Sequence, residues 1–268
     1  MRRSEPWKSL GWRHDLWDLV RYYYSIRGDV NRREWLLKLG GTGTMDLFEA
    51  GTLPIAGEDV ELLKQYLQIR QEQLESALAS LRTETEALRY CRSQAMQVGV
   101  TPTQSTDHHQ ASKALVATVA YVAEKVTAPL GIDLNADPQT RCVWLHCNRL
   151  HVTARNLDGA IPSLTNPAIV WEIKEYWGKT KGGSKMSDAV YECNLVGREL
   201  REYEERAGVS VVHAVFVDGR EQWNARKSDL ARFIDLLNQG LIDYLFVGRE
   251  VEEDWETVLQ THLKDFEW

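Results

Sequence analysis

The chain has 268 residues, of which 43% are hydrophobic and 26% charged, and its formal net charge at pH 7 is −7. This length allows one large domain or two modest ones with a substantial core, and the composition is ordinary for a soluble globular protein. The negative charge argues against a protein that coats nucleic acid through bulk electrostatics, although a local basic site is compatible with it.

The sequence also lacks the features that mark several other classes of protein. No window approaches the ~20 apolar residues that span a bilayer, and no secretory signal follows Met1, so we expect a cytoplasmic protein without a membrane partner. The four cysteines form no dense framework, which fits a reducing compartment. The chain has no phosphate-binding loop of the G-x-x-x-x-G-K-[ST] type, so it is not expected to be an ATP motor.

The first hundred residues are predicted to be helical. Helical spacing of apolar residues indicates one helix over 12–23 and a short one over 31–39. A long polar helix is expected over 58–98, with apolar residues recurring at a spacing near 3.5. This seam fits either a helix packed along its own domain or a dimer-forming coiled coil, and the second alternative predicts a homodimer.

A stretch rich in Pro, Gly, Thr and Ser, "GVTPTQSTDHHQ", is the best linker candidate. It divides the chain into an N-terminal helical region (1–104), expected to bind DNA or to dimerise, and a second domain (105–268). The second domain is predicted to contain helices over 111–127, 187–207 and 229–238, and strands over 142–147, 150–154, 159–164, 168–174, 209–217 and 243–247. Its fold class is therefore α/β, with a central sheet of antiparallel and parallel pairs.

The strand over 168–174 carries two charged residues at its end, Glu172 and Lys174. Burying charge is costly unless the charge is paired or holds a metal. Residues two apart in a strand share a face, so these two side chains point the same way. A turn at residues 165–167 lets the preceding strand fold back, so that Asp158 converges with Glu172 at one end of the sheet.

These residues are the candidate catalytic and metal-binding site. The carboxylates of Asp158 and Glu172 and the carbonyl of Ile173 form a hard-oxygen site suited to Mg²⁺, for which Mn²⁺ can substitute. A metal there would polarise a phosphodiester and acidify a bound water. Lys174 would orient or deprotonate the attacking water, or stabilise developing negative charge.

The motif resembles that of the PD-(D/E)XK nuclease superfamily. Leu157-Asp158-Gly159 is followed, after thirteen residues, by Glu172-Ile173-Lys174. The order helix, strands, helix, strand over residues 111–218 is also similar. Leu157 departs from the proline of the motif at a position that is loose in the family. The resemblance implies a restriction-endonuclease-like fold, a central mixed sheet flanked by helices, and it suggests Glu124 as a further acidic residue of the site.

By the same resemblance, the expected function is Mg²⁺-dependent DNA endonuclease activity, in a sequence-specific type II restriction enzyme or another antiphage defence enzyme. Two alternatives remain open. One is a catalytically silent DNA-binding or interaction module on the same fold, and the other is a nuclease that acts on RNA or single strands.

A basic, glycine-rich stretch follows the motif directly. Its candidate DNA-binding residues are Lys179, Lys181, Ser184, Lys185 and Ser187. A basic loop beside a metal site and before a helix N-terminus is suited to phosphate contacts, whereas the plainer interpretation is a solvated loop. Because Lys174 lies close by in the sequence, phosphate contact is favoured.

The segment "CVWLHCNRLH" offers two cysteines and two histidines, which suggests a zinc site. In a strand, Cys142 and His146 face one side while Cys147 and His151 face the other. Four ligands therefore do not converge without a bend, and strand packing is the favoured interpretation.

Overall fold

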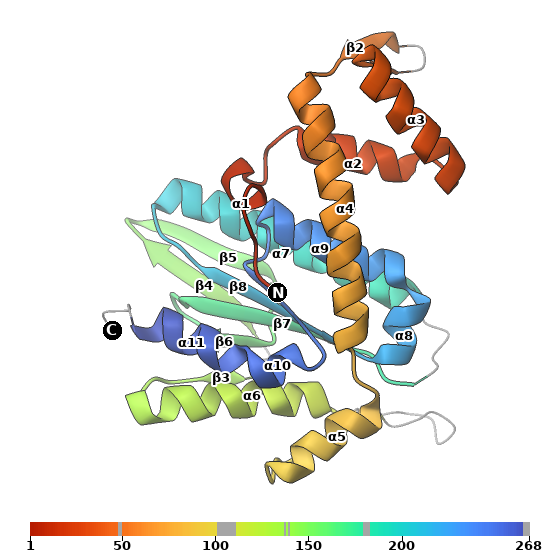
Figure 1. Cartoon of the computed structure of the whole chain (residues 1–268). Helices are drawn as coiled ribbons and strands as arrows, with labels where there is room; N and C mark the ends of the chain where they lie inside the picture. Colours follow the sequence, from red (N-terminus) through yellow and green to blue (C-terminus); the bar gives the residue numbers. More distant parts are fainter. Residues whose placement is uncertain (48–49, 101–110, 137, 139, 179–182, 265–268) are drawn as a thin grey trace.

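An N-terminal helical lobe stands on an α/β core in the computed structural model, which describes residues 1–47, 50–100, 111–136, 138, 140–178 and 183–264 (Figure 1). The N-terminal lobe has its own hydrophobic cluster, in which Trp7, Trp17 and Tyr66 are buried. Its elements are α1 (Trp7–Leu10), α2 (Leu16–Ser25), α3 (Asp29–Thr42), β1 (Thr44–Asp46), β2 (Thr52–Pro54) and α4 (Gly57–Ser80). None of the helices in the described ranges is both long and apolar enough to cross a membrane.

The single helix expected over 58–98 is two helices, α4 and α5 (Glu84–Ser93). The second helix starts anew because Thr83 and Glu86 form a reciprocal capping box. Leu63 packs in the core of the lobe, whereas Leu74 and Ala77 pack against the α/β core. The apolar seam is thus buried within its own chain, as in the first of the two alternatives.

The α/β core is built on a five-stranded sheet of order β3-β6-β7-β8-β9. Strand β7 pairs antiparallel with β6 and parallel with β8, which in turn pairs parallel with β9. The strands are β3 (Asn135–Ala136), β6 (Gly159–Ile161), β7 (Ile169–Glu175), β8 (Val212–Asp218) and β9 (Tyr244–Val247). The prediction of a mixed α/β sheet is confirmed.

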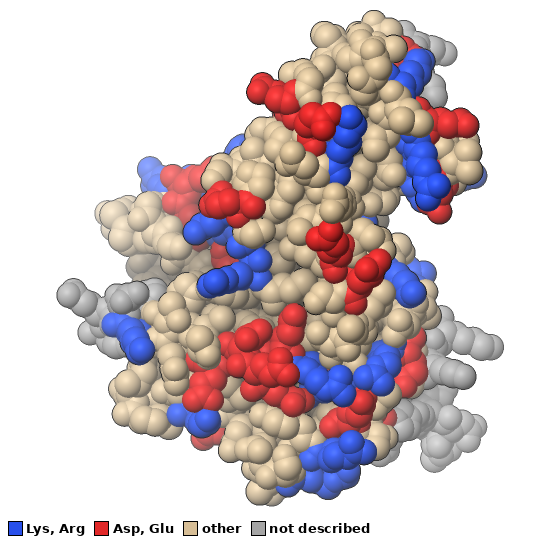
Figure 2. Space-filling view, viewed as in Figure 1, with Lys and Arg blue, Asp and Glu red and all other residues tan. Residues whose placement is uncertain are grey.

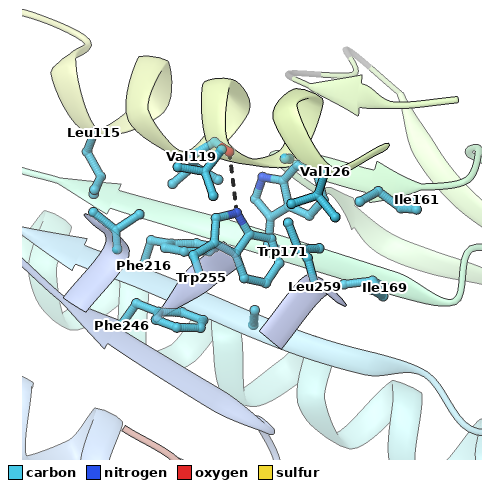
Figure 3. Close-up of a cluster of buried hydrophobic side chains, with 14 of the residues drawn as sticks. Leu115, Val119, Val126, Ile161, Ile169, Trp171, Phe216, Phe246, Trp255 and Leu259 are labelled. Atoms are coloured by element: carbon cyan, nitrogen blue, oxygen red, sulfur yellow. Dashed lines mark hydrogen bonds between the residues drawn. The ribbon is translucent and has the colours of Figure 1, made fainter. Parts of the chain in front are cut away.

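Helices cover both faces of this sheet. One face packs against α6 (Ala114–Thr127) and α11 (Trp255–Lys264), and there Trp171 and Phe216 surround Trp255, whose indole N–H donates to Val119 O at 3.3 Å (Figure 3). The other face packs against α7 (Gly183–Ala207) and α9 (Lys227–Gln239). Both faces are covered, which explains why every residue of β8 is buried.

Several elements differ from the expectation. The strands β4 (Arg141–His146) and β5 (Arg149–Asn156) form a separate two-stranded hairpin sheet. Five helices of the described ranges were not expected: α1, η2 (Ala128–Leu130), α8 (Arg220–Ala225), α10 (Glu250–Glu253) and α11. The proposed domain boundary falls within 101–110, outside the described residues. Helix α5 already packs against α6, through Ala87 and Cys91.

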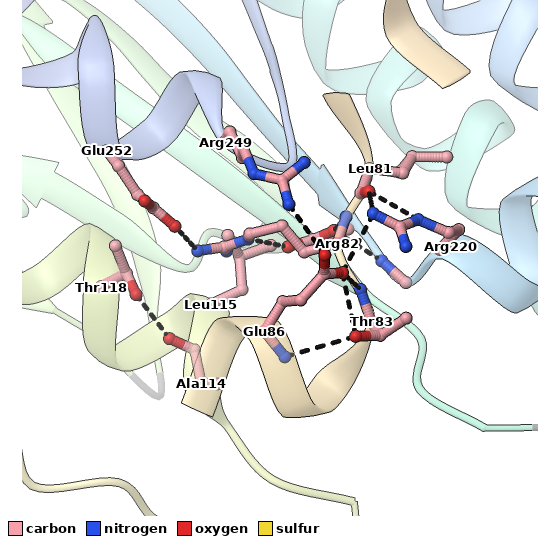
Figure 4. A network of polar contacts seen from close by, with 12 residues as sticks. Leu81, Arg82, Thr83, Glu86, Ala114, Leu115, Thr118, Arg220, Arg249 and Glu252 are labelled. Atoms are coloured by element: carbon pink, nitrogen blue, oxygen red, sulfur yellow. Dashed lines mark hydrogen bonds and ion pairs between the residues drawn. The ribbon is translucent and has the colours of Figure 1, made fainter. Parts of the chain in front are cut away.

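A buried ion-pair network joins the α4–α5 connection to the ends of β8 and β9 (Figure 4). Arg82 and Asp218 are both almost fully buried, and the Arg82 backbone N–H and Nε donate to the two Asp218 oxygens at 2.8 and 2.6 Å. Arg82 also pairs with Glu252 of α10, and Glu86 accepts from Arg249 at 2.8 Å. This network attaches the N-terminal lobe to the core.

Gly159 begins β6 directly after Asp158 and lies against the ring of Trp171. A Cβ atom at position 159 would stand 1.8 Å from that ring, a distance that no side chain can occupy. Only glycine fits unless the Trp171 indole moves out of the core cluster between the sheet and α6. The glycine of the Asp158-Gly159 pair therefore has a packing role.

We expect Gly159→Ala to lower the free energy of unfolding by about 2–4 kcal/mol, because the added methyl group overpacks the Trp171 site. Chemical denaturation followed by tryptophan fluorescence measures this change. Gly41→Ala is the matched control, since Gly41 lies in α3 with nothing within 4 Å of its added Cβ. The control should be neutral or slightly stabilising, and equal stability of both variants would contradict the packing role.

Candidate functional site

The candidate site lies between β7 and α7. The odd-numbered residues of β7, Ile169 and Trp171, pack toward α6, whereas Val170 packs toward α7. Since side chains alternate along a strand, Glu172 and Lys174 also face α7, as the sequence predicted. This strand combines an apolar face with a face that becomes charged toward its carboxyl end.

Glu172 and Lys174 form a buried ion pair. Lys174 Nζ lies 2.9 Å from Glu172 Oε2, and the two residues are only 8% and 2% exposed. Helix α7 adds Glu192, whose Oε2 lies 3.1 Å from the same ammonium. Arg155 of β5 then pairs with Glu192 Oε1 at 2.8 Å. Charges of alternating sign therefore extend from the interior to the surface.

The neighbouring strand β8 contributes His213, which is fully buried. Its Nε2 lies 3.2 Å from Glu172 Oε1, and its Nδ1 lies 3.2 Å from the carbonyl oxygen of Leu241. Because a carbonyl only accepts hydrogen bonds, Nδ1 must carry the hydrogen of that bond. Both ring nitrogens of His213 therefore have partners, Glu172 of β7 and the backbone just before β9.

The electrostatic environment fixes the charge states of the ion pair. Burial by itself raises the pKa of Glu172, but Lys174 and His213 outweigh it and lower the pKa to about 2. Burial lowers the pKa of Lys174, but Glu172 outweighs it and raises that pKa well above its ordinary value. Lys174 is therefore an ammonium, which is suited to orienting oxygen atoms and stabilising negative charge rather than to removing a proton.

Asp158 lies at the edge of β7, where the pairing with β6 ends at Gly159 and Trp171. Its backbone N–H donates to Trp171 O at 3.0 Å, and its Oδ2 accepts from the N–H of Ile173 at 2.7 Å. In a strand, the N–H and C=O of one residue point to the same side. The carbonyl of Ile173 therefore faces the edge that Asp158 occupies.

The donor set has the chemistry of a magnesium site, because Mg²⁺ commonly takes one or two carboxylates and retains several waters. Asp158, the Ile173 carbonyl and Glu172 supply such oxygens from two adjacent segments. No group of three or more His, Cys, Asp or Glu side chains in the described ranges is arranged to hold a metal ion. A cation here would therefore rest on two carboxylates and one carbonyl, completed by water.

The structure does not bring every predicted residue to this site. Glu124 is exposed on α6, which covers the opposite face of the sheet, so its proposed role is corrected. Ser187 is also directed elsewhere: its hydroxyl contacts Asp229 at 3.3 Å and accepts from Arg226 at 2.8 Å. Lys185 is exposed at the start of α7. Lys179, Lys181 and the side chain of Ser184 lie outside the described residues.

The sequence interpretation missed Glu192 and His213. His213 is a polar residue within the apolar strand "VVHAVFV", which is the signal that singled out Glu172. Glu192 borders the apolar stripe of α7, and nothing in the sequence indicates that this helix packs on the charged face of β7. Only the packing of α7 on the sheet relates Glu192 to Lys174.

For the β4–β5 hairpin, the structure supports strand packing, the interpretation that the sequence favoured over a zinc site. Cys142 is buried against Trp144 and the helix α7, whereas Cys147 is exposed at the hairpin turn. His151 stacks on Tyr203 with ring centroids 4.9 Å apart. Cys142 and His151 therefore serve packing on the inner side of the hairpin.

Residues 72–262 match a protein family described as "Domain of unknown function (DUF7687)". The chain belongs to the DUF7687 family. The matched part of the chain includes all the residues of the candidate site and begins within α4, so it leaves out most of the N-terminal lobe. No curated protein and no solved structure matches the chain.

The surface around α10 and α11 is acidic. Figure 2 shows acidic side chains gathered where these helices lie in Figure 1, and α10 alone carries Glu250, Glu252 and Glu253. Polyanions are repelled by such a surface.

We expect Lys174→Met to lower the free energy of unfolding by about 3–5 kcal/mol, because Glu172 loses the cation that balances its buried charge. Since the pKa of Glu172 lies near 2 in the folded state and near 4.5 ordinarily, its stabilisation is present above pH 4.5 and is lost as the pH falls toward 2. Denaturation curves between pH 3 and 7 should show this loss of stability in the wild-type protein and a smaller loss in the variant.

The double variant Glu172→Gln with Lys174→Met is the control for this prediction. It removes both charges and should be more stable than the sum of the two single effects predicts. If the effects of the two substitutions on the free energy of unfolding add, and the pH profile of Lys174→Met is parallel to that of the wild type, the two side chains are not coupled.

Proposed function

We propose that this protein is a Mg²⁺-dependent nuclease that hydrolyses phosphodiester bonds in DNA. The observation that carries the proposal is the position of Asp158 at the edge of β7, where its carboxylate contacts the N–H of Ile173 between Glu172 and Lys174. The end of β7 thus carries one acidic side chain, a backbone carbonyl and an ammonium, and the adjacent segment before β6 adds the second acidic side chain. If Glu172 and Lys174 formed only a structural ion pair, a second carboxylate, that of Asp158, would not be needed beside them.

The residues of the chain have distinct roles in this proposal. Asp158, Glu172 and the Ile173 carbonyl would hold the cation, which supplies Lewis-acid activation of a phosphate oxygen and of a water molecule. Lys174, restrained by Glu172 and Glu192, donates hydrogen bonds to a phosphate oxygen as negative charge develops.

His213 and Arg155 act through other residues and are positioning residues. His213 contacts one oxygen of Glu172, which fixes the orientation of the carboxylate that Lys174 contacts through the other. Arg155 holds Glu192 in the same way. Such supporting contacts restrict the rotamers of the groups that touch the substrate and so reduce the cost of reaching the reactive geometry.

The arrangement of strands supports a restriction-endonuclease-like fold as part of the proposal. Strand β7 carries the paired residues, β6 is its antiparallel neighbour and β8, which follows α7, is its parallel neighbour. By resemblance, the biological setting is a cytoplasmic restriction or antiphage enzyme. Because each chain has one such site, cleavage of both strands of a duplex requires two subunits or two successive events.

The test is incubation of the purified protein with plasmid DNA and Mg²⁺. We expect cleavage, its loss in the presence of a chelator and its recovery with Mn²⁺. Asp158→Asn and Lys174→Arg should each lower the rate by at least about 100-fold, because each alters a group at the reacting phosphate. Glu124→Gln is the matched control, since this exposed carboxylate lies on the opposite side of the sheet, and it should retain the wild-type rate.

Cleavage that survives in both Asp158→Asn and Lys174→Arg would overturn the assignment of these residues. Binding of DNA without cleavage under any metal condition would instead identify a binding module. Parallel assays with duplex DNA, single-stranded DNA and RNA of the same sequence decide the substrate, and a preference for RNA or single strands would replace the duplex in the proposal.

A further inference from the structure

A cavity of about 300 Å³ lies between the N-terminal lobe and α9, away from the candidate nuclease site. Figure 1 shows α4 extending from the lobe past α9, with α2 beside its upper part. Helix α2 provides Trp17, Val20, Arg21 and Tyr24, α4 provides Arg70, and α9 provides Arg232. A volume of this size lies at the lower end of the range of small-molecule sites.

The lining of this cavity carries more positive than negative charge. Its three guanidinium groups face one carboxylate, Asp235. Arg70 uses that carboxylate fully: its Nε donates to Oδ1 at 2.6 Å and its Nη2 donates to Oδ2 at 2.8 Å. Tyr66 also donates to Oδ1, at 2.6 Å. Arg70 and Asp235 therefore neutralise each other within the wall, which leaves the charges of Arg21 and Arg232.

Those two arginines have partners that a ligand can replace. Arg21 pairs with Asp18 on the same helix, and the side chains are 53% and 74% exposed. Arg232 lies 3.4 Å from Asp229, and its guanidinium stands over the ring of Tyr191 at 4.6 Å. The Arg21–Asp18 pair joins two exposed side chains and contributes little free energy, so a phosphate that accepts bidentate hydrogen bonds competes with it effectively. Asp229 is buried, but it keeps its ion pair with Arg226, at 2.7 Å, when Arg232 turns to a ligand.

The remaining wall is aromatic and apolar. The guanidinium of Arg70 stands over one face of the Tyr24 ring, 4.0 Å from its centroid, and this ring is 40% exposed. Trp17 and Val20 are buried beneath. Arg70 therefore holds the Tyr24 ring in place, and a planar base can pack against the aromatic and apolar side of the cavity.

We propose that this cavity binds a nucleotide, with its phosphate between Arg21 and Arg232 and its base against Tyr24. The ligand is either a free mononucleotide or one nucleotide of a nucleic-acid strand, because both present the same phosphate and planar ring. The site does not depend on the proposed nuclease activity, since it shares no residue with the β7 site.

The test is isothermal titration calorimetry of the full chain without divalent cations, with four probes: dAMP, inorganic phosphate, adenosine and a single-stranded oligonucleotide of about ten nucleotides. We expect saturable binding of dAMP that is tighter than that of phosphate or adenosine. The double variant Arg21→Gln with Arg232→Gln should weaken dAMP binding by at least about tenfold. The single variant Arg21→Gln changes an exposed side chain and provides the same test should the double variant be unstable.

Arg198→Gln is the matched control, because Arg198 lies on α7 outside the cavity and stands over Trp12 at 5.6 Å. It should leave dAMP binding unchanged. If the oligonucleotide binds more tightly than dAMP and the double variant loses this binding, the ligand is one nucleotide of a strand. If the two probes bind with equal affinity, the ligand is a free nucleotide. Absence of saturable binding by the wild type, equal affinity for adenosine and dAMP, or unchanged affinity in both arginine variants would overturn the proposal.

Discussion

The central constraint in this protein is the burial of two opposite charges on a strand that is covered on both sides. Glu172 and Lys174 lie almost without exposure on β7. An unpaired charge at such a depth costs several kcal/mol, so each group needs partners on every side. The partners come from three elements, since β7 itself provides the ion pair, β8 provides His213 and α7 provides Glu192. The packing of α7 on the sheet is therefore coupled to the charge states of the site.

A second buried pair determines how the N-terminal lobe meets the core. Arg82 and Asp218 join the α4–α5 connection to the end of β8, and Arg70 and Asp235 join α4 to α9. With one such attachment within α4 and another just after its end, α4 has little freedom to rotate against the core. The walls of the cavity between the lobe and α9 are held in place by the same contacts, which favours ligand binding without a large rearrangement.

Helix α7 borders both proposed sites. Tyr191, which contacts Arg232 at the cavity, is adjacent in α7 to Glu192, which contacts Lys174 in the candidate nuclease site. The acidic surface around α10 and α11 lies elsewhere (Figure 2).

The sequence by itself determined much of the α/β core and part of the site. Alternation and apolar runs predicted β7 and β8, and the two-residue spacing put Glu172 and Lys174 on one face, because these are local properties of a strand. The break between α4 and α5 was also encoded locally, in the capping box of Thr83 and Glu86, although the apolar periodicity concealed it.

Only the tertiary structure decided which distant side chains meet. Glu192 and His213 join the site, and Glu124 lies outside it, because the packing of α7 and α6 on opposite faces of the sheet is set by the whole core and not by any local pattern. The cavity between α2 and α9 likewise unites side chains from three separate segments. Contacts of this kind depend on the sum of many weak packing terms, which no short stretch of sequence contains.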